Sequence, residues 1–330
     1  MTLKHKSVLL IAALSLPVLA PTMIRAQPSD ESGESYYFLV PDSETGGDNE
    51  VLVFDVEQDR ILKSTVSPDD LNCFSRGWRQ SVHSGKWVVL PQEVFALKAP
   101  SLQAARADIR LSYPEELKAT SRSIITSDHG VRFVEFSYSG AHYYIPAALV
   151  VGKSDQSIEE LMATPIGCEL VDLDNPLPLD YVPADLVRVN QRWNFHGASY
   201  PKYLRAEAAE MLNMMLSEAE RQRIHLRVFS AYRSSKKQRF LYLQEISRSG
   251  LQQRSVAKPG HSEHQLGTAV DLCGLDPETV ASSEFGETRM GVWLTDNAVR
   301  FGFRQTYTKE NTRAAGYIPE PWHFRYLGRD

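Results

Sequence analysis

A proline-rich segment near the middle of the chain most constrains the fold, because it separates two regions of different texture. It reads ELVDLDNPLPLDYVPADL, residues 169–186, with prolines at positions 176, 178 and 183. Proline lacks a backbone N–H and fixes φ, so this segment cannot continue a helix or a central strand. We predict that residues 169–186 form a linker and the entry to a second domain.

The region before this linker is predicted to be rich in β-structure. Short runs of β-branched and aromatic residues, such as VLVFDV and VRFVEFSY, are separated by turn-forming stretches such as DSETGGDN. This predicts a β-rich accessory domain over residues 36–168, after a flexible polar tail at residues 27–35. Residues 130–150 resemble the final hairpin of a bacterial SH3-like domain. For the more polar residues 99–125 we expect a helical insertion or a long loop.

The region after the linker mixes helices and strands. Residues 204–223 place apolar side chains at helical spacing, and Ser234 and Gly250 are suited to begin and end a second helix. The runs TAVDLC and WHFRYL are typical of strands. This pattern predicts an α+β domain over residues 187–330.

Residues 1–26 are typical of a signal peptide. Lys4 and Lys6 precede the apolar run VLLIAALSLPVLA, and the following IRA ends in a small residue suited to cleavage. The run is too short to span a bilayer comfortably, so we expect no membrane span in the mature chain. An uncleaved anchor is the alternative. We predict export to the periplasm, the cell envelope or the medium.

Charge and cysteine content narrow the class of protein further. The formal net charge is −5, so the basic excess of a nucleic-acid-binding surface is missing and no nucleic-acid partner is expected. Cysteines of an exported protein can pair. Cys273 follows a strand-like run and is expected to be buried. Cys73 and Cys168 form a disulfide, or all three cysteines are free.

The candidate chemistry lies in the stretch PGHSEHQLGTAVDLCG, residues 259–274. His264 and Asp271 are of the types that bind zinc. A fully extended segment would hold their side chains roughly 23 Å apart, so a turn at Gly267 is needed to bring both to one ion. The third ligand must come from elsewhere, and His323 in EPWHFRY is the best candidate.

Glu320 lies three residues before His323 and fits the role of a catalytic base. Zinc lowers the pKa of its water to about 7, and a nearby carboxylate can take that proton and pass it to a leaving amine. The residues alone leave a second interpretation open. In it His264 is a turn histidine, Asp271 caps a turn or pairs with an arginine, and His323 is a core histidine with satisfied hydrogen bonds.

Four segments taken together resemble the VanY-type zinc D-Ala-D-Ala carboxypeptidases. They are SAYRSSKKQ, PGHSEHQLGTAVDL, WLTDNAVRFGF and EPWHFRYLG, and the similarity covers about residues 173–328. The resemblance implies an α+β metallopeptidase fold shared with hedgehog-type proteins, one zinc ion, and hydrolysis of the terminal D-Ala peptide bond of peptidoglycan stem peptides or muropeptides. Both D,D- and L,D-specificity occur in this family, and the sequence does not separate them.

The resemblance also implies roles for individual side chains. Its zinc ligands, base and substrate-binding arginine match His264, Asp271, His323, Glu320 and Arg233. The same match implies that Arg233 steadies the developing oxyanion, and that Gln238 and Ser262 lie near the terminal carboxylate of the substrate. An arginine suits these tasks because its rigid fork of donors fits carboxylate oxygens.

Some features near the motif have other expected roles. His261 is expected to line the pocket without binding zinc, and Glu263 to be a structural partner. The chain departs from the family at Ala231, where glycine is usual, and at residues 304–316, a loop that borders the site in the family and bears on substrate preference. SSKK, residues 234–237, matches a motif of serine penicillin-binding enzymes, but their K-T-G segment is missing.

Two other functions remain open on the sequence. An endopeptidase that cuts wall cross-links would need a groove open at both ends, whereas a carboxypeptidase needs a pocket closed by a carboxylate-binding group. A zinc-containing binding module would keep the ligands without turnover. The β-rich domain is expected to bind the wall or a partner protein, or to orient the catalytic domain.

Overall fold

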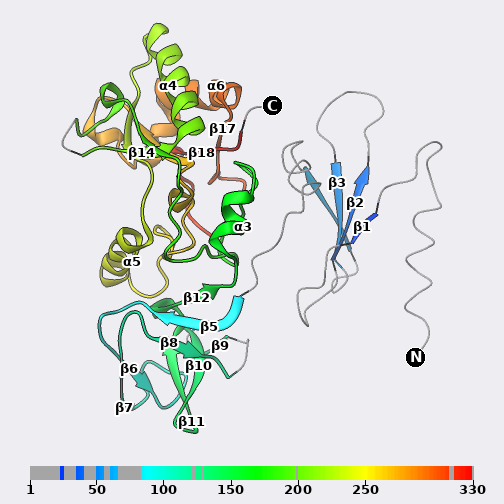
Figure 1. The fold of residues 1–330 in the computed structure, drawn as a ribbon, viewed down its shortest axis with the longest axis vertical. Coiled ribbons are helices and arrows are strands. Elements are labelled where there is room, and N and C mark those ends of the chain that lie inside the picture. Colours follow the sequence, from blue (N-terminus) through cyan, green and yellow to red (C-terminus); the bar gives the residue numbers. More distant parts are fainter. Residues whose placement is uncertain are drawn as a thin grey trace. The chain divides into compact units, whose positions relative to one another are not determined.

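The computed structural model describes residues 23–25, 35–40, 50–55, 60–65, 83–120, 124–127, 130–197, 200–311 and 316–328. The chain falls into two compact units, Met1–Arg76 and Gly77–Asp330 (Figure 1). The apolar run of the predicted signal peptide and Cys73 lie outside the described residues.

The described part of the first unit is a four-stranded antiparallel sheet in the order β1–β2–β3–β4. Its strands are Met23–Arg25, Ser35–Val40, Glu50–Asp55 and Arg60–Thr65. The β-texture predicted from the sequence is therefore present here. The β-rich domain predicted over residues 36–168 includes the boundary between the two units, and its limits remain a prediction.

The second unit begins with two small sheets, in the orders β7–β6–β11–β10–β9 and β12–β5–β8. The strands are β5 His83–Val89, β6 Val94–Leu97, β7 Arg106–Leu111, β8 Glu116–Lys118, β9 Ile125–Thr126, β10 Arg132–Tyr138, β11 Ala141–Pro146 and β12 Val150–Ser154. The hairpin predicted within residues 130–150 is confirmed, because β10 pairs with β11 from Phe133–Pro146 to Tyr138–Ala141.

The helix or long loop expected at residues 99–125 is wrong, because β7, β8 and the start of β9 occupy this stretch. In β7 only Ala107 and Leu111 are fully buried, and the arginines and the aspartate face outward or lie partly exposed. A strand with one solvent-facing side carries this much polarity, so the polar composition reflected burial on one face only.

The remainder of the second unit is α+β, as predicted. Its main sheet has the order β15–β16–β18–β17, formed by Arg227–Ser230, Ala269–Cys273, His323–Tyr326 and Phe303–Gln305. A short ribbon pairs β13 (Leu186–Arg188) with β14 (Tyr203–Arg205). The helices are α3 Ile158–Ala163, α4 Ala206–Arg221, α5 Ser235–Ser249 and α6 Arg289–Asn297.

The two predicted helices form for the predicted reasons. The buried face of α4 consists of Ala208, Met211, Leu212, Met215, Leu216 and Ala219. In α5 the Ser234 hydroxyl accepts a hydrogen bond from the Lys237 N–H at 3.3 Å, and Gly250 ends the helix with φ +84°. A capping hydroxyl satisfies an N–H that has no partner within the helix.

Strand β16 is buried at every position and pairs with β15 on one side and β18 on the other. A strand in this position needs a near-continuous apolar run, which the AVDLC sequence supplies except at Asp271. A buried carboxylate is costly unless polar partners surround it. The fold therefore requires partners for Asp271 on the neighbouring elements.

The proline-rich segment, residues 169–186, packs into the domain at several points. Val171, Leu177 and Tyr181 form a buried cluster with Leu161 and Leu266.

Among the described residues, none of the helices combines the length and apolar character needed to cross a membrane.

The cysteines give a prediction for chemical labelling. Cys168 is disulfide-bonded, whereas Cys273 is free and fully buried, and burial raises its pKa to about 12. We expect native protein at pH 8 to resist iodoacetamide at both positions, because alkylation needs an accessible thiolate. Unfolding without reductant should expose Cys273 alone, and added reductant should also release Cys168. Peptide mapping by mass spectrometry reads each site, and modification of native Cys168 would contradict the assignment.

Candidate metal centre

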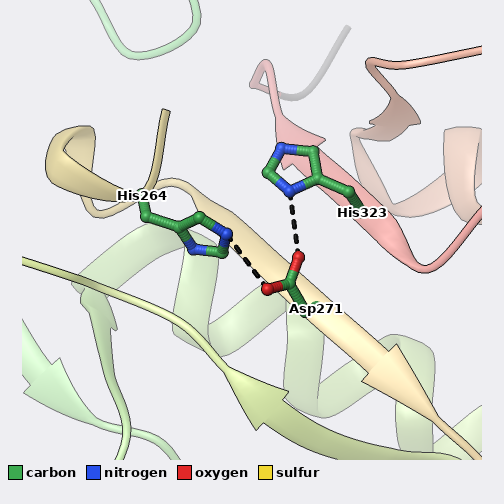
Figure 2. A group of neighbouring side chains, drawn as sticks. All are labelled: His264, Asp271 and His323. Carbon is green, nitrogen blue, oxygen red and sulfur yellow. Dashed lines mark hydrogen bonds and ion pairs between the residues drawn. The ribbon is translucent and has the colours of Figure 1, made fainter. Parts of the chain in front are cut away.

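The three side chains predicted as metal ligands come together beside the main sheet (Figure 2). His264 belongs to the short 3-10 helix η3 (Glu263–Leu266), Asp271 to the middle of β16, and His323 to the first position of β18. Antiparallel pairing places Asp271 directly opposite His323. One potential ligand atom from each residue lies within 4.8 Å of the other two.

Gly267 makes the turn that the sequence required between His264 and Asp271. It ends η3 in the left-handed region with φ +73°, and a Cβ atom at this position would lie 2.9 Å from a methyl group of Leu186. Glycine adopts this conformation without steric cost. The turn brings Nε2 of His264 to 3.1 Å from Oδ2 of Asp271.

The hydrogen bonds of the two histidines direct one nitrogen of each ring toward Asp271. Nδ1 of His264 lies 2.8 Å from the carbonyl of Ala231, so this nitrogen donates and Nε2 keeps its lone pair. Nε2 of His323 lies 2.8 Å from Oε2 of Glu263, while its Nδ1 lies 2.9 Å from Oδ1 of Asp271. Metal-binding histidines characteristically donate their other N–H to a carbonyl or a carboxylate, so the donor set fits a metal ion.

Electrostatics in this cluster favour a positive charge at its centre. Burial alone would raise the pKa of Asp271, but His264 and His323 hold it well below its usual range. Burial lowers the pKa of His264, which keeps that ring neutral. Burial also opposes the charge on His323, yet Asp271 and Glu263 raise its pKa to about 10. A proton or a metal ion at Nδ1 of His323 meets the same demand for positive charge.

Glu263 is the structural partner of His323, in agreement with the sequence prediction. Its carboxylate accepts from His323 and from the Thr306 hydroxyl at 2.7 Å, and Nη1 of Arg325 lies 3.1 Å away. Burial would raise the pKa of Glu263, but Arg325 and His323 lower it to about 2. Arg325 also donates to the backbone carbonyl of Glu169. The orientation of His323 is therefore fixed by a buried network of charged groups.

Glu320 lies at the edge of the cluster, on the side where Nδ1 of His323 points. Its Oε2 is 3.9 Å from that nitrogen, and its side chain is 16% exposed. Burial raises the pKa of Glu320 to about 7, although nearby His323 and Arg233 act in the opposite direction. A carboxyl group with this pKa can accept and return a proton near neutral pH.

Arg233 lies beside Asp271, just before α5. Its Nη2 is 3.7 Å from Oδ2 of Asp271 and 2.9 Å from the Ser230 hydroxyl. Its Nη1 donates to Oε1 of Gln238 at 2.9 Å, and its backbone N–H donates to the carbonyl of His264. The guanidinium is thus held next to the ligands with 20% of the side chain still exposed.

The remaining predicted positions, Gln238, Ser262 and His261, are all buried. Both ends of the Gln238 amide bind protein groups, because its Nε2 donates to the Ala257 carbonyl at 2.8 Å. Ser262 is buried and precedes η3 without capping it through its side chain. Nδ1 of His261 lies 2.6 Å from the carbonyl of Asp172, and His261 is not part of the ligand group.

Several residues around the cluster could not be found from the sequence. The ring of Tyr307 lies 5.0 Å from that of His323 and 5.4 Å from that of Tyr317. Lys202 lies near Arg233, and burial together with Arg233 lowers its pKa. Neither Tyr307 nor Lys202 belongs to a motif or a periodic pattern, so only the folded chain brings them to the site.

An α+β domain that gathers two imidazoles, a carboxylate, a second carboxylate of raised pKa and an arginine has the groups of a metal-dependent peptidase. Residues 201–329 match the family model described as "VanY: D-alanyl-D-alanine carboxypeptidase". This part of the chain belongs to the VanY-type carboxypeptidase family.

Curated relatives agree with this family. The YodJ protein of Bacillus subtilis, a carboxypeptidase by name, is 36% identical over 162 residues, which are 48% of this chain and 59% of that protein. A D-alanyl-D-alanine carboxypeptidase of Enterococcus faecalis is 28% identical over 171 residues, 48% of this chain and 58% of that protein. The chain thus spans less than two thirds of the length of these two relatives.

Two solved structures are also similar to this chain. The LdcB LD-carboxypeptidase shares 33% identity with a TM-score of 0.47, covering 54% of this chain and 81% of that one. VanYB in complex with D-alanine-D-alanine shares 28% identity with a TM-score of 0.40, covering 48% and 86%.

The contact between Glu263 and His323 generates a prediction for metal affinity. The negative charge of Glu263 orients His323 and raises the basicity of its ring. Glu263→Gln removes this charge, so we expect zinc affinity to fall by roughly 10- to 100-fold. Competition with a chromogenic chelator measures this affinity. The exposed Glu278 provides the matched control, since Glu278→Gln should leave it unchanged. Equal affinity for the Glu263 variant and the parent would refute the role.

Proposed function

We propose that this protein is an exported zinc-dependent carboxypeptidase that removes the terminal D-alanine from peptidoglycan stem peptides. The observation that carries the proposal is the buried His264–Asp271–His323 group with Glu320 and Arg233 beside it. It lies within the region that belongs to the VanY-type family. The relatives' names support the same substrate class.

The chemistry follows from how these side chains are placed. Nε2 of His264, the carboxylate of Asp271 and Nδ1 of His323 would hold one zinc ion, which when bound supplies a Lewis acid that polarises the scissile carbonyl and lowers the pKa of water. Glu320 accepts the proton of the attacking water and delivers it to the leaving amine nitrogen. Its pKa of about 7 suits both transfers.

In addition to the metal ion, Arg233 provides a positive charge at the proposed site. Its guanidinium binds the substrate carboxylate and stabilises the negative charge that develops on the scissile carbonyl oxygen. Gln238 accepts a hydrogen bond from the guanidinium, and Ser262 is proposed to line the end of the pocket. A cationic group that binds the substrate carboxylate closes one end of the pocket. This arrangement favours release of a single C-terminal residue from both D,D- and L,D-substrates.

Export and domain organisation complete the proposal. Residues 1–26 would be a signal peptide that directs the chain to the periplasm or cell envelope, and the disulfide at Cys168 is consistent with an oxidising compartment. Residues 187–330 would be the hedgehog-like catalytic domain. The β-rich residues 36–168 would be an SH3-like accessory domain that contacts the cell wall or a partner protein.

The direct test is incubation of the purified protein with defined tetrapeptide and pentapeptide muropeptides, followed by mass spectrometry. We expect loss of one alanine, abolished by a chelator and restored by zinc. Glu320→Ala should lower kcat by at least about 100-fold while zinc content stays unchanged, because the base is not a ligand. Cleavage within cross-links would indicate an endopeptidase instead. Bound zinc without any product would indicate a binding module.

A zinc mechanism also predicts how β-lactams behave. The Ser234–Lys237 pair matches a serine-enzyme motif, but the Ser234 hydroxyl caps α5. We expect no stoichiometric acylation by a labelled penicillin, measured by intact-mass spectrometry, with a serine penicillin-binding protein as the positive control. Covalent labelling at Ser234 would overturn the metal mechanism.

A further inference from the structure

The β-rich part of the second unit, residues 83–154, packs directly against α5. A buried apolar cluster joins the two, and it consists of Val88, Leu90, Val151 and Tyr242. The Tyr242 hydroxyl donates to the carbonyl of Ala148 at 2.9 Å, and Nε of Arg239 donates to the carbonyl of Leu90 at 2.6 Å. Hydrogen bonds as well as apolar contacts therefore fix the position of residues 83–154 relative to α5.

Lys258, in the loop after α5, adds a third link to the β-rich part. Its ammonium donates to the carbonyl of Ala147 at 2.7 Å and to the carbonyl of Val150 at 2.9 Å. Burial lowers the pKa of Lys258 to about 8, and nearby Arg132 adds to this effect. An ammonium buried at such an interface is costly unless acceptors are fixed around it, so both carbonyls define where Lys258 sits.

The neighbour of Lys258 connects this interface to the candidate site. The carbonyl of Ala257 accepts from Nε2 of Gln238 at 2.8 Å, and Oε1 of Gln238 accepts from Nη1 of Arg233 at 2.9 Å. Gln238 is only 1% exposed, so its amide has one orientation that serves both partners. Arg233 in turn lies 3.7 Å from Asp271.

We propose that residues 83–154 position the substrate-binding Arg233 through Lys258 and Gln238, and so form a structural part of the site. Lys258 and Gln238 are positioning residues in this account. Their effect on catalysis rests on the proposed function, in which Arg233 binds the carboxylate of the substrate. The β-rich part then sets how well substrate is bound, whether or not it also contacts the wall.

The first test is the steady-state kinetics of Lys258→Met in the full chain with a muropeptide substrate. Loss of the links should raise KM by roughly three- to tenfold, as expected for one or two hydrogen bonds, and should also lower kcat, because Arg233 is proposed to stabilise the developing oxyanion as well as the substrate carboxylate. Zinc affinity should stay unchanged, because the three ligands lie on other elements. The control is Lys236→Met, which removes an exposed ammonium from α5. A lower melting temperature with unchanged KM would reduce Lys258 to a purely structural role and overturn the proposal.

A double-mutant cycle tests whether Lys258 acts through Gln238. If it does, Lys258→Met added to Gln238→Met should change KM by less than about twofold, because the connection is already broken. Multiplication of the two single effects would contradict the connection.

Hydrogen exchange tests the coupling without any turnover. Lys258→Met should accelerate exchange by roughly threefold or more in peptides that cover residues 233–242, relative to the parent and to Lys236→Met. Unchanged exchange there would overturn the proposal even if the protein proves inactive. Failure of the proposed function would instead appear as absent turnover in the parent chain with the exchange effect intact.

Discussion

The buried carboxylate of Asp271, held between two imidazoles, is the interaction on which the site depends. It stands in a strand that is otherwise apolar and fully buried, where an uncompensated charge would oppose folding. The register of β16 and β18 and the turn at Gly267 supply the compensation from His323 and His264. The contacts that compensate the buried charge therefore also bring together the three donors of the candidate metal centre.

Each imidazole is oriented by a second group, and these groups extend the site into the rest of the domain. Glu263 and Arg325 connect His323 to Glu169, and Nη1 of Arg205 lies 2.8 Å from the carboxylate of Glu169. Removal of one partner from such a buried network leaves an unpaired charge behind. The proline-rich segment contributes to this network, because its first residue, Glu169, contacts both Arg325 and Arg205.

The sequence predicted the parts of this structure that depend on local pattern. The buried face of α4, the cap at Ser234 and the turn at Gly267 follow from spacing and residue type, and all three are present. Local pattern alone could not identify the ligand set, because His323 lies far from Asp271 in the sequence. Only the motif that contains His323 connected the two residues. The polar residues of β7 led to the wrong prediction of a helix or loop at residues 99–125. They lie on the exposed face of a strand.

Contacts between distant segments lay beyond any pattern in the sequence. Tyr307 reaches the ring of His323 from a loop, and Lys258 reaches the carbonyls of Ala147 and Val150. Neither position has a periodic or motif signal, because their partners are set by tertiary packing. The contacts on which the proposed role of residues 83–154 rests are therefore visible only in the folded chain.

X-ray absorption at the zinc edge of the purified protein tests the central claim most directly. The His264–Asp271–His323 centre predicts bound zinc with nitrogen and oxygen neighbours only, at about 2.0–2.2 Å, and multiple scattering from two imidazoles. Asp271→Asn should weaken the binding without adding a sulfur neighbour. A sulfur shell at about 2.3 Å, scattering from a single imidazole, or no zinc uptake would contradict the account.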